Sequence, residues 1–200
     1  MEQPSLHRQS GDPDLYKLDS NAGTILITGI TASGKTTLGK QLFQNLINAG
    51  IQKVKLLDGE EIRVELKKKG LSLGYSIEDR NILVKEYAKI AQDYNLKGET
   101  VIICTIASSK ECRNAVRKQL GNFMEVYLDC PVNECAKRDY KGHYKKALNG
   151  EYETFIGVTN PYEISENPEV ILRTGEMSID QCSDILYKKV VAFLIKNGFI

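Results

Sequence analysis

The chain has no tryptophan, only 5 prolines among 200 residues, and no apolar run near the roughly 18 residues that a membrane span requires. Its 27 Lys and Arg nearly balance 26 Asp and Glu, so the strong basic excess of a dedicated nucleic-acid binder is also missing. The glycines and prolines are too few for a collagenous or largely disordered chain. We therefore expect a globular protein with no nucleic-acid and no membrane partner.

The 5 cysteines are odd in number and form no C-x-x-C pair, so neither a disulfide framework nor a zinc ribbon is indicated. The first residues contain no apolar segment of the signal-peptide type. Both observations favour a reducing compartment, and we expect a cytoplasmic protein.

Short apolar runs alternate with helical patterns from residue 24 onward. Residues 1–22 are polar and show no period, which is typical of a flexible tail, and residues 23–200 suit one domain. The apolar runs predict strands over 24–28, 54–57, 100–104, 125–128 and 170–172. Helical patterns cover 36–49, 76–94, 111–120, 132–137 and 178–197. Such an alternation predicts a three-layer α/β fold, a parallel sheet with helices on both faces.

The most specific motif joins the first predicted strand to the first predicted helix. Residues 29–36 read Gly-Ile-Thr-Ala-Ser-Gly-Lys-Thr and fit the pattern G-x-x-x-x-G-K-[ST] of P-loop NTPases. In such a loop, backbone N–H groups surround a polyphosphate and a lysine reaches the β- and γ-phosphates. A threonine hydroxyl coordinates Mg²⁺. The predicted nucleotide-binding residues are Gly29, Thr31, Ala32, Ser33, Gly34, Lys35, Thr36 and Thr37.

A phosphate loop indicates a nucleotide without naming the reaction. The N-K-x-D signature of a GTPase is absent from the sequence, and a lone domain without an assembly segment does not suit a motor ATPase. These features favour a small-molecule kinase of the nucleoside-monophosphate-kinase type.

Acidic residues and an arginine follow the second predicted strand, in the order Asp58-Gly59-Glu60-Glu61-Ile62-Arg63. The carboxyl ends of parallel strands face the ligand crevice, so we expect these acids near the transferred phosphoryl group. A carboxylate there can orient the attacking hydroxyl or hold Mg²⁺. Asp58 and Glu60 are therefore catalytic candidates beside Lys35, with the choice of base between them open, and Thr36 and Asp58 are the predicted metal ligands.

From about residue 23 to 174 the chain resembles the adenylylsulfate kinase family. The phosphate loop is followed by Asp58 to Arg63, against the family's D-G-D-x-x-R. The further matching segments, each with the family pattern, are Leu73 to Arg80 (L-G-F-S-x-x-D-R), Arg138 to Tyr144 (R-D-x-K-G-L-Y), Phe155 to Val158 (F-T-G-I), and Pro161 to Glu163 with Asn167-Pro168 (P-Y-E and N-P).

The resemblance implies transfer of the ATP γ-phosphoryl group to the 3′-hydroxyl of adenosine 5′-phosphosulfate, under a mobile lid that covers both nucleotides. Four lid cations, which can stabilise charge on the transferring group, are Arg138, Lys141, Lys145 and Lys146. By the resemblance, Arg138 joins the ATP site, Lys141 joins the catalytic residues, and Tyr75 and Phe155 sandwich the acceptor base. The implied acceptor-binding residues are Arg63, Tyr75, Arg80, Asn81, Lys141 and Phe155. A homodimer is compatible with this assignment.

The departures from the family pattern concern the acceptor side. They are Glu60 for the second acid, Asn81 to Val84 for N-I-R-R, two residues early in register and with neither arginine, Ala107 for the serine of F-I-S-P, and His143 for the leucine of K-G-L-Y. Lys85 and Arg113 are cations that could replace the missing arginines. We interpret His143 as a surface side chain.

Two alternatives to adenylylsulfate phosphorylation stay open. One is a related kinase for another activated nucleotide, such as the cytidine diphosphoramidate of capsule biosynthesis. The other is a weakly catalytic nucleotide-binding regulator, against which the intact Lys35, Thr36 and Asp58 argue.

Overall fold

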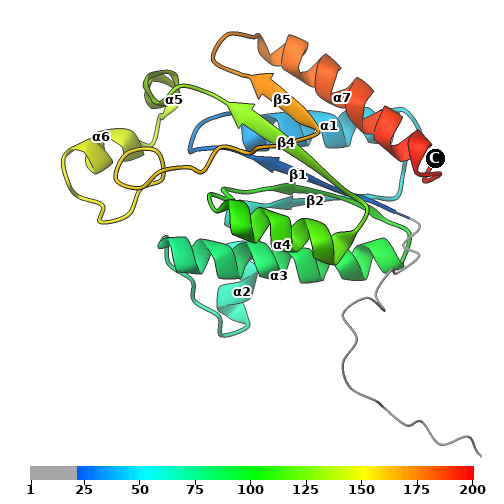
Figure 1. Ribbon diagram of the computed structural model, residues 1–200, viewed down its shortest axis with the longest axis horizontal. Helices are drawn as coiled ribbons and strands as arrows, with labels where there is room; N and C mark the ends of the chain where they lie inside the picture. Colours follow the sequence, from blue (N-terminus) through cyan, green and yellow to red (C-terminus); the bar gives the residue numbers. More distant parts are fainter. Residues whose placement is uncertain (1–21) are drawn as a thin grey trace, which may run out of the picture.

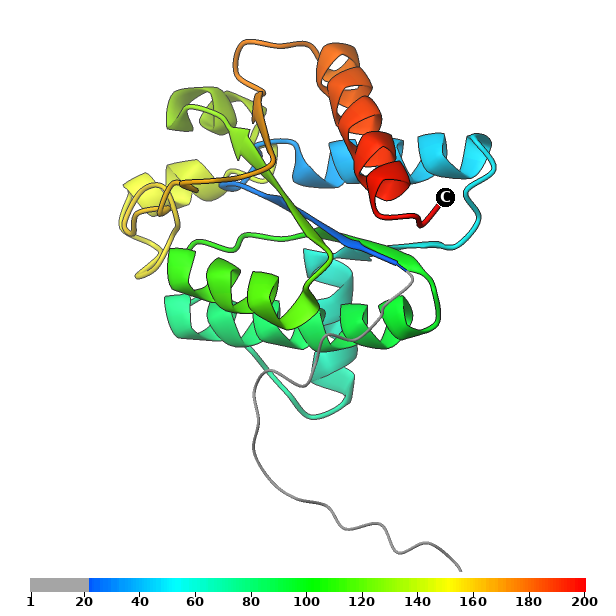
Figure 2. The same ribbon diagram turned by 45° about the vertical axis from the view of Figure 1, so that its right-hand side comes forward.

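The computed structural model describes residues 22–200, so the expected tail over 1–22 lies almost entirely outside the described residues. Five strands form one parallel sheet in the order β2-β3-β1-β4-β5 (Figures 1 and 2). The strands are β1 (Thr24–Thr28), β2 (Val54–Asp58), β3 (Thr100–Cys104), β4 (Phe123–Asp129) and β5 (Val170–Arg173). The predicted parallel α/β sheet is confirmed.

Helices cover both faces of the sheet and complete three layers (Figure 1). One face carries α1 (Lys35–Asn48) and α7 (Ile179–Lys196), and the other carries α2 (Gly59–Lys68), α3 (Ile77–Leu96) and α4 (Lys110–Leu120). Among residues 22–200, no helix has both the length and the apolar character needed to cross a membrane.

The central strand β1 shows why this arrangement follows from the sequence. Ile25 and Ile27 belong to the core shared with α1 and α7, whereas Leu26 belongs to the core under α3 and α4. Successive side chains of a strand point to opposite faces, so a strand covered on both faces reads as one continuous apolar run.

Helix α1 approaches the sheet closely at Gly39. A Cβ atom at this position would overlap Sγ of Cys104 on β3. The Cys104 thiol also donates a hydrogen bond to the carbonyl of Lys35, at 3.3 Å. The absent side chain of Gly39 thus allows the start of α1, and with it the phosphate loop, to lie directly against the sheet.

Two helices were not predicted from the sequence, whereas the ends of the other five agree within two residues. Helix α2 has only two buried apolar side chains, Ile62 and Leu66, in a charged segment. Two buried side chains are too few to give a clear helical period in the sequence. The helix is also stabilised by its N-cap Asp58, whose side chain accepts a hydrogen bond from the N–H of Glu60. The other unpredicted helix, α6 (His143–Leu148), is only six residues long.

Helices α5 (Val132–Arg138) and α6 stand beyond the carboxyl ends of the strands, at the left of Figures 1 and 2. We call residues 139–160 the lid segment. Its apolar residues, among them Tyr144 and Phe155, pack against Ile30 of the phosphate loop. Just after the lid segment, Tyr162 Oη lies 3.0 Å from Thr28 Oγ1 at the end of β1. The lid segment is thereby attached to the same strand end as the phosphate loop.

Candidate active site

The phosphate loop makes a tight turn between β1 and α1. Ala32 has a φ of 58° and Gly34 a φ of 103°, both in the left-handed region. Glycine adopts this conformation freely, whereas alanine rarely does. No side chain caps α1 after Gly34, so the first N–H groups of this helix can bind an anion.

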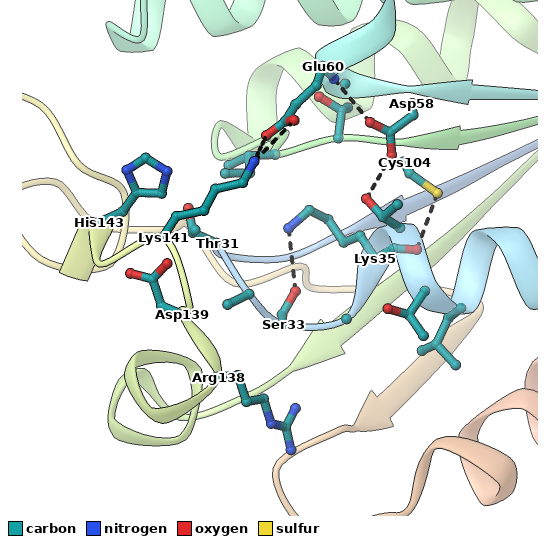
Figure 3. Close-up of a pocket in the computed structure, with 18 of the residues that line it drawn as sticks. Thr31, Ser33, Lys35, Asp58, Glu60, Cys104, Arg138, Asp139, Lys141 and His143 are labelled. Atoms are coloured by element: carbon teal, nitrogen blue, oxygen red, sulfur yellow. Dashed lines mark hydrogen bonds and ion pairs between the residues drawn. The ribbon is translucent and has the colours of Figure 1, made fainter.

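Lys35 bends back over this loop (Figure 3). Its Nζ donates to the carbonyl of Ile30 at 2.6 Å and lies 3.5 Å from Ser33 Oγ. Burial lowers the pKa of Lys35 to about 8, and the positive charge of Arg80 acts in the same direction. A polyphosphate would supply the counter-charge that this ammonium group lacks.

Thr36 and Asp58, the predicted metal ligands, lie together at the start of α1 and the end of β2. Thr36 Oγ1 donates to Asp58 Oδ2 at 2.7 Å, and Asp58 Oδ1 accepts the N–H of Glu60 at 3.1 Å. Within residues 22–200 no group of three or more His, Cys, Asp or Glu could hold a metal ion. One hydroxyl and one carboxylate suit Mg²⁺, which usually takes one or two protein oxygens and completes its shell with water and substrate phosphate.

One cavity of about 1070 Å³ extends from the phosphate loop to the lid segment. Its volume slightly exceeds the usual range of about 300–1,000 Å³ for ligand pockets, so it has room for two nucleotides. The predicted site residues that line it are Thr31, Ala32, Ser33, Gly34, Lys35, Thr36, Thr37, Asp58, Glu60, Arg63, Tyr75, Arg80, Arg138, Lys141 and Phe155.

Arg63 of α2 and Arg80 of α3 flank the ring of Tyr75 on one wall of this cavity. Their guanidinium carbons lie 4.7 and 5.5 Å from the ring centre. Arg63 donates to the carbonyls of Leu73 and Gly74, and Arg80 Nε donates to the carbonyl of Tyr75. No carboxylate of the described residues pairs with either guanidinium. Burial, together with the positive charge of Arg63, lowers the pKa of Arg80 to about 10.

The lid contributes one cation to the space between the phosphate loop and this wall. Lys141 Nζ pairs with the Glu60 carboxylate, whose hydrogen bond and charge raise the pKa of Lys141. Arg138 extends the other way, toward β5 (Figure 3), and donates to the carbonyl of Thr174 at 2.7 Å. Lys145 and Lys146 do not line the cavity, so only two of the four predicted cations reach it.

Phe155, the predicted stacking residue of the lid, lies within a group of aromatic rings. Tyr152 is parallel to it, with ring centres 5.8 Å apart and planes 10° apart. Tyr144 contacts it edge-on at 4.9 Å and donates its hydroxyl to the carbonyl of Thr31, at 2.8 Å. The aromatic group is therefore joined to the phosphate loop. Tyr75 lines the same cavity from the α2–α3 connection.

Two predicted site residues do not line the cavity, namely Gly29 and Asn81. Asn81 Oδ1 is buried and has no hydrogen-bond partner in the described part of the chain. Leu83 and Val84, the last two residues of the Asn81–Val84 segment, are each 2 % exposed and pack in the core under α3. Neither side chain lines the cavity.

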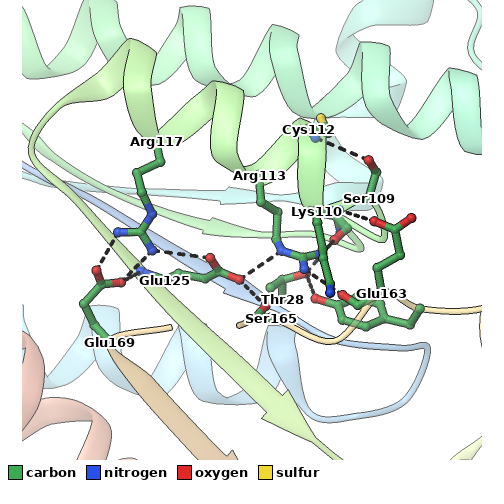
Figure 4. A network of polar contacts seen from close by, with 12 residues as sticks. Thr28, Ser109, Lys110, Cys112, Arg113, Arg117, Glu125, Glu163, Ser165 and Glu169 are labelled. Carbon is green, nitrogen blue, oxygen red and sulfur yellow. Dashed lines mark hydrogen bonds and ion pairs between the residues drawn. The ribbon is translucent and has the colours of Figure 1, made fainter. Parts of the chain in front are cut away.

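Arg113 does not replace the missing arginines. Its side chain is 2 % exposed, and its Nε lies 3.0 Å from Oε1 of Glu125 (Figure 4). It also donates to the carbonyls of Ala107 and Glu163, at 2.6 Å each. Arg113 therefore joins α4, β4 and the segment after the lid. Lys85, the other candidate, is exposed and does not line the cavity either.

Several residues that were not predicted also line the cavity, among them Thr174, Tyr152 and His143, which make hydrogen bonds within the site. Thr174 Oγ1 donates to the carbonyl of Ser33 at 2.9 Å and so fixes the phosphate loop to the segment after β5. Tyr152 and His143 line the cavity from the lid. Because Tyr152 stands three residues before Phe155, the sequence could have indicated that the two aromatic rings pair. The contact between Thr174 and Ser33 joins residues 141 positions apart, so no local sequence pattern could have predicted it.

Comparisons with known proteins agree with this geometry. A family profile described as adenylylsulphate kinase matches residues 21–173. An adenylyl-sulfate kinase of Clostridium kluyveri is 38% identical over 193 residues, covering 95% of this chain and 93% of the relative. Another, from Synechococcus sp. (strain JA-3-3Ab), is 38% identical over 167 residues, covering 84% and 93%. The APS kinase of Mycobacterium tuberculosis, solved in complex with AMPPNP and APS, superposes with a TM-score of 0.78 at 30% identity, covering 85% of this chain and 98% of that one.

Proposed function

This chain belongs to the adenylylsulphate kinase family, and we propose on that ground that it transfers the γ-phosphoryl group of ATP to the 3′-hydroxyl of adenosine 5′-phosphosulfate. The observation that carries the proposal is one cavity with a phosphate loop at one end and two guanidinium groups on its wall, Arg63 and Arg80, which pair with no carboxylate of residues 22–200. Such groups suit a polyphosphate donor and an anionic acceptor. A homodimer stays a prediction.

The donor end holds the polyphosphate through charge and backbone dipoles. The N–H groups at the start of α1 and the Lys35 ammonium group would bind the phosphates of ATP. Lys35 would exchange its bond to the Ile30 carbonyl for phosphate oxygens. Thr36 and Asp58 would hold Mg²⁺, which supplies neutralising charge on the β- and γ-phosphates when bound.

At the acceptor end we assign Glu60, rather than Asp58, to the attacking hydroxyl. Asp58 is buried, and both of its oxygens already accept hydrogen bonds, from Thr36 and from the Glu60 N–H. The Glu60 carboxylate is exposed in the cavity, and among residues 22–200 its polar contact is with Lys141. Glu60 would orient the hydroxyl and take its proton, and Lys141 would then stabilise charge on the transferring group.

The acceptor is held between the lid and the opposite wall in this proposal. Arg63 and Arg80 would bind its 5′ anionic group, since neither pairs with a carboxylate in the described part of the chain. Tyr75 and the Phe155 ring group would stack on its base. Closure of the lid segment over both nucleotides would exclude water from the transferring phosphoryl group.

An acceptor panel tests the proposal. The full chain is incubated with Mg-ATP and adenosine 5′-phosphosulfate, AMP or cytidine diphosphoramidate, and ADP release is measured while the phosphorylated position is located by mass spectrometry. We expect ADP release with the first acceptor and a 3′-phosphorylated product. Transfer to the cytidine compound alone would show that the chain catalyses the same reaction on a different acceptor. Absence of transfer to every acceptor, with ATP binding intact, would favour the regulator.

A further inference from the structure

His143 is not an isolated surface side chain, because it lines the cavity and bonds to a second lid residue. It is the first residue of α6, where the family pattern has leucine. Its Nδ1 lies 2.9 Å from the Tyr152 hydroxyl, and the two ring centres are 6.0 Å apart. Leucine could pack against Tyr152 but could not hydrogen-bond to it, so this contact depends on histidine at position 143.

The start of α6 is itself held firmly. The N–H of Tyr144 donates to Asp139 Oδ2 at 2.7 Å, and the Tyr144 hydroxyl donates to the carbonyl of Thr31. The residue next to His143 is therefore bound both to the lid's own turn and to the phosphate loop. This makes His143 a fixed point on the inner side of the lid.

Tyr152, by contrast, lies in an irregular stretch between α6 and Phe155. The polar contact of its side chain within the described residues is the one to His143, and its ring stacks on Phe155 with planes 10° apart. The His143 hydrogen bond therefore fixes the hydroxyl of Tyr152, and with it the ring that stacks on Phe155.

We propose that His143 is a positioning residue for the nucleotide acceptor: its hydrogen bond to Tyr152 holds the parallel Tyr152 and Phe155 rings in the orientation on which the acceptor base stacks. The inference rests on the proposed function, since it requires a base-bearing acceptor at this end of the cavity. His143 acts through Tyr152 and takes no part in the phosphoryl transfer itself. Removing the contact should weaken acceptor binding without slowing the chemical step.

The test uses two variants that remove one partner each. Tyr152→Phe keeps the ring and deletes the hydroxyl, and His143→Leu deletes the hydrogen-bonding ring. Each should raise the KM for the acceptor about 3- to 10-fold, the worth of one hydrogen bond, with kcat and the KM for ATP within about twofold. The double variant should be no worse than either single variant, because both break the same contact.

Two controls complete the design. Tyr187→Phe removes a hydroxyl from α7, outside the cavity, and should leave the acceptor KM unchanged. His143→Gln, which keeps a hydrogen-bonding group, should recover part of the acceptor affinity that His143→Leu loses. If both single variants are active and keep the wild-type KM for the acceptor, the inference is overturned. It is also overturned if the effects of the two substitutions on this KM add up in the double variant.

A ligand-free measurement separates this inference from the proposed function. Wild-type protein that phosphorylates no adenosine 5′-phosphosulfate overturns the function, and hydrogen exchange then decides the positioning role. Amides of residues 149–157 should exchange about 3- to 10-fold faster in Tyr152→Phe than in wild type or Tyr187→Phe, since local opening becomes easier. Equal exchange rates in the three proteins would overturn the inference.

Discussion

Lys141 Nζ lies 2.9 Å from Oε1 and 3.2 Å from Oε2 of Glu60, so the lid segment and the first turn of α2 are joined across the cavity by one ion pair. Glu60 is the longer acid at a position where the family pattern has aspartate. The contact places a carboxylate and an ammonium group together in the cavity that the phosphate loop also lines (Figure 3). A base and a charge-stabilising group for phosphoryl transfer are needed in that space.

Glu60→Gln should lower kcat about 100-fold, because a base is lost while the side-chain shape is kept. The KM for ATP should change little, since Glu60 does not contact the phosphate loop. Glu60→Asp should retain activity toward adenosine 5′-phosphosulfate. Steady-state kinetics decide between these outcomes, with Glu65→Gln on the exposed side of α2 as the matched control. A Glu60→Gln enzyme as fast as wild type would show that Glu60 is not the base.

Lys35→Ala should reduce phosphoryl transfer at least about 100-fold, because the ammonium group compensates charge that develops on the phosphates. The fold should survive, since the hydrogen bonds of the Lys35 ammonium group are made within the loop itself. Turnover is compared with that of Lys53→Ala, which removes an exposed lysine before β2. Near-normal turnover in a Lys35→Ala protein with an unchanged melting temperature would refute the phosphate-loop assignment.

The pKa of about 8 for Lys35 predicts a pH-dependent affinity for ATP. Bound phosphates favour the charged ammonium group and so raise this pKa in the complex. Below pH 8 the lysine is charged in both states, and the affinity is constant. Above pH 8 binding must take up a proton, so the affinity falls with rising pH by up to about tenfold per pH unit.

Titration calorimetry with a non-hydrolysable ATP analogue between pH 7 and 9.5 measures this effect. Two buffers of different ionisation enthalpy report the proton uptake directly. Lys35→Arg is the comparison, because an arginine stays charged over the whole range. Affinity that does not change with pH in the wild-type protein would contradict the lowered pKa.

Arg63→Ala and Arg80→Ala should each raise the KM for adenosine 5′-phosphosulfate about 10- to 100-fold, as expected for one charge-assisted hydrogen-bonding group. The KM for ATP should stay within about twofold of wild type. Because both arginines also bind carbonyls near Tyr75, melting temperatures are recorded alongside. If the KM for ATP rises as much as the KM for adenosine 5′-phosphosulfate, these arginines do not bind the acceptor specifically.

Glu125→Gln should lower the free energy of unfolding by about 3–5 kcal/mol, because it leaves the Arg113 charge buried without its partner. The side chains of Arg113 and Glu125 are 2 % and 6 % exposed, and Ser165 and Arg117 also bind the same carboxylate (Figure 4). Urea unfolding measures the change. Glu134→Gln, which breaks an exposed pair with Lys137, should leave the urea midpoint unchanged. Equal midpoints for Glu125→Gln and wild type would show that the buried network contributes no stability.

The local parts of the fold and the site were predictable from the order of residues alone. The apolar run at residues 24–28 and the loop at 29–36 are short segments whose conformation depends on their own side chains and on burial of both strand faces. Lys35, Thr36 and Asp58 consequently meet where parallel strands end, as the motif predicts. Helix α2 escaped prediction because its two buried residues depend on packing against the sheet.

The acceptor wall and the lid contacts depend on residues that are far apart along the chain. The sequence position of Arg113 allowed a role in binding the acceptor. In the fold, however, its side chain is buried against Glu125. From the sequence, His143 was interpreted as a surface side chain. In the structure, its ring lies within hydrogen-bond distance of the Tyr152 hydroxyl. A side chain's charge and size are properties of the sequence, whereas its solvent exposure and its partner follow from how strands and helices pack. That packing set which cations line the cavity and which are buried in the core.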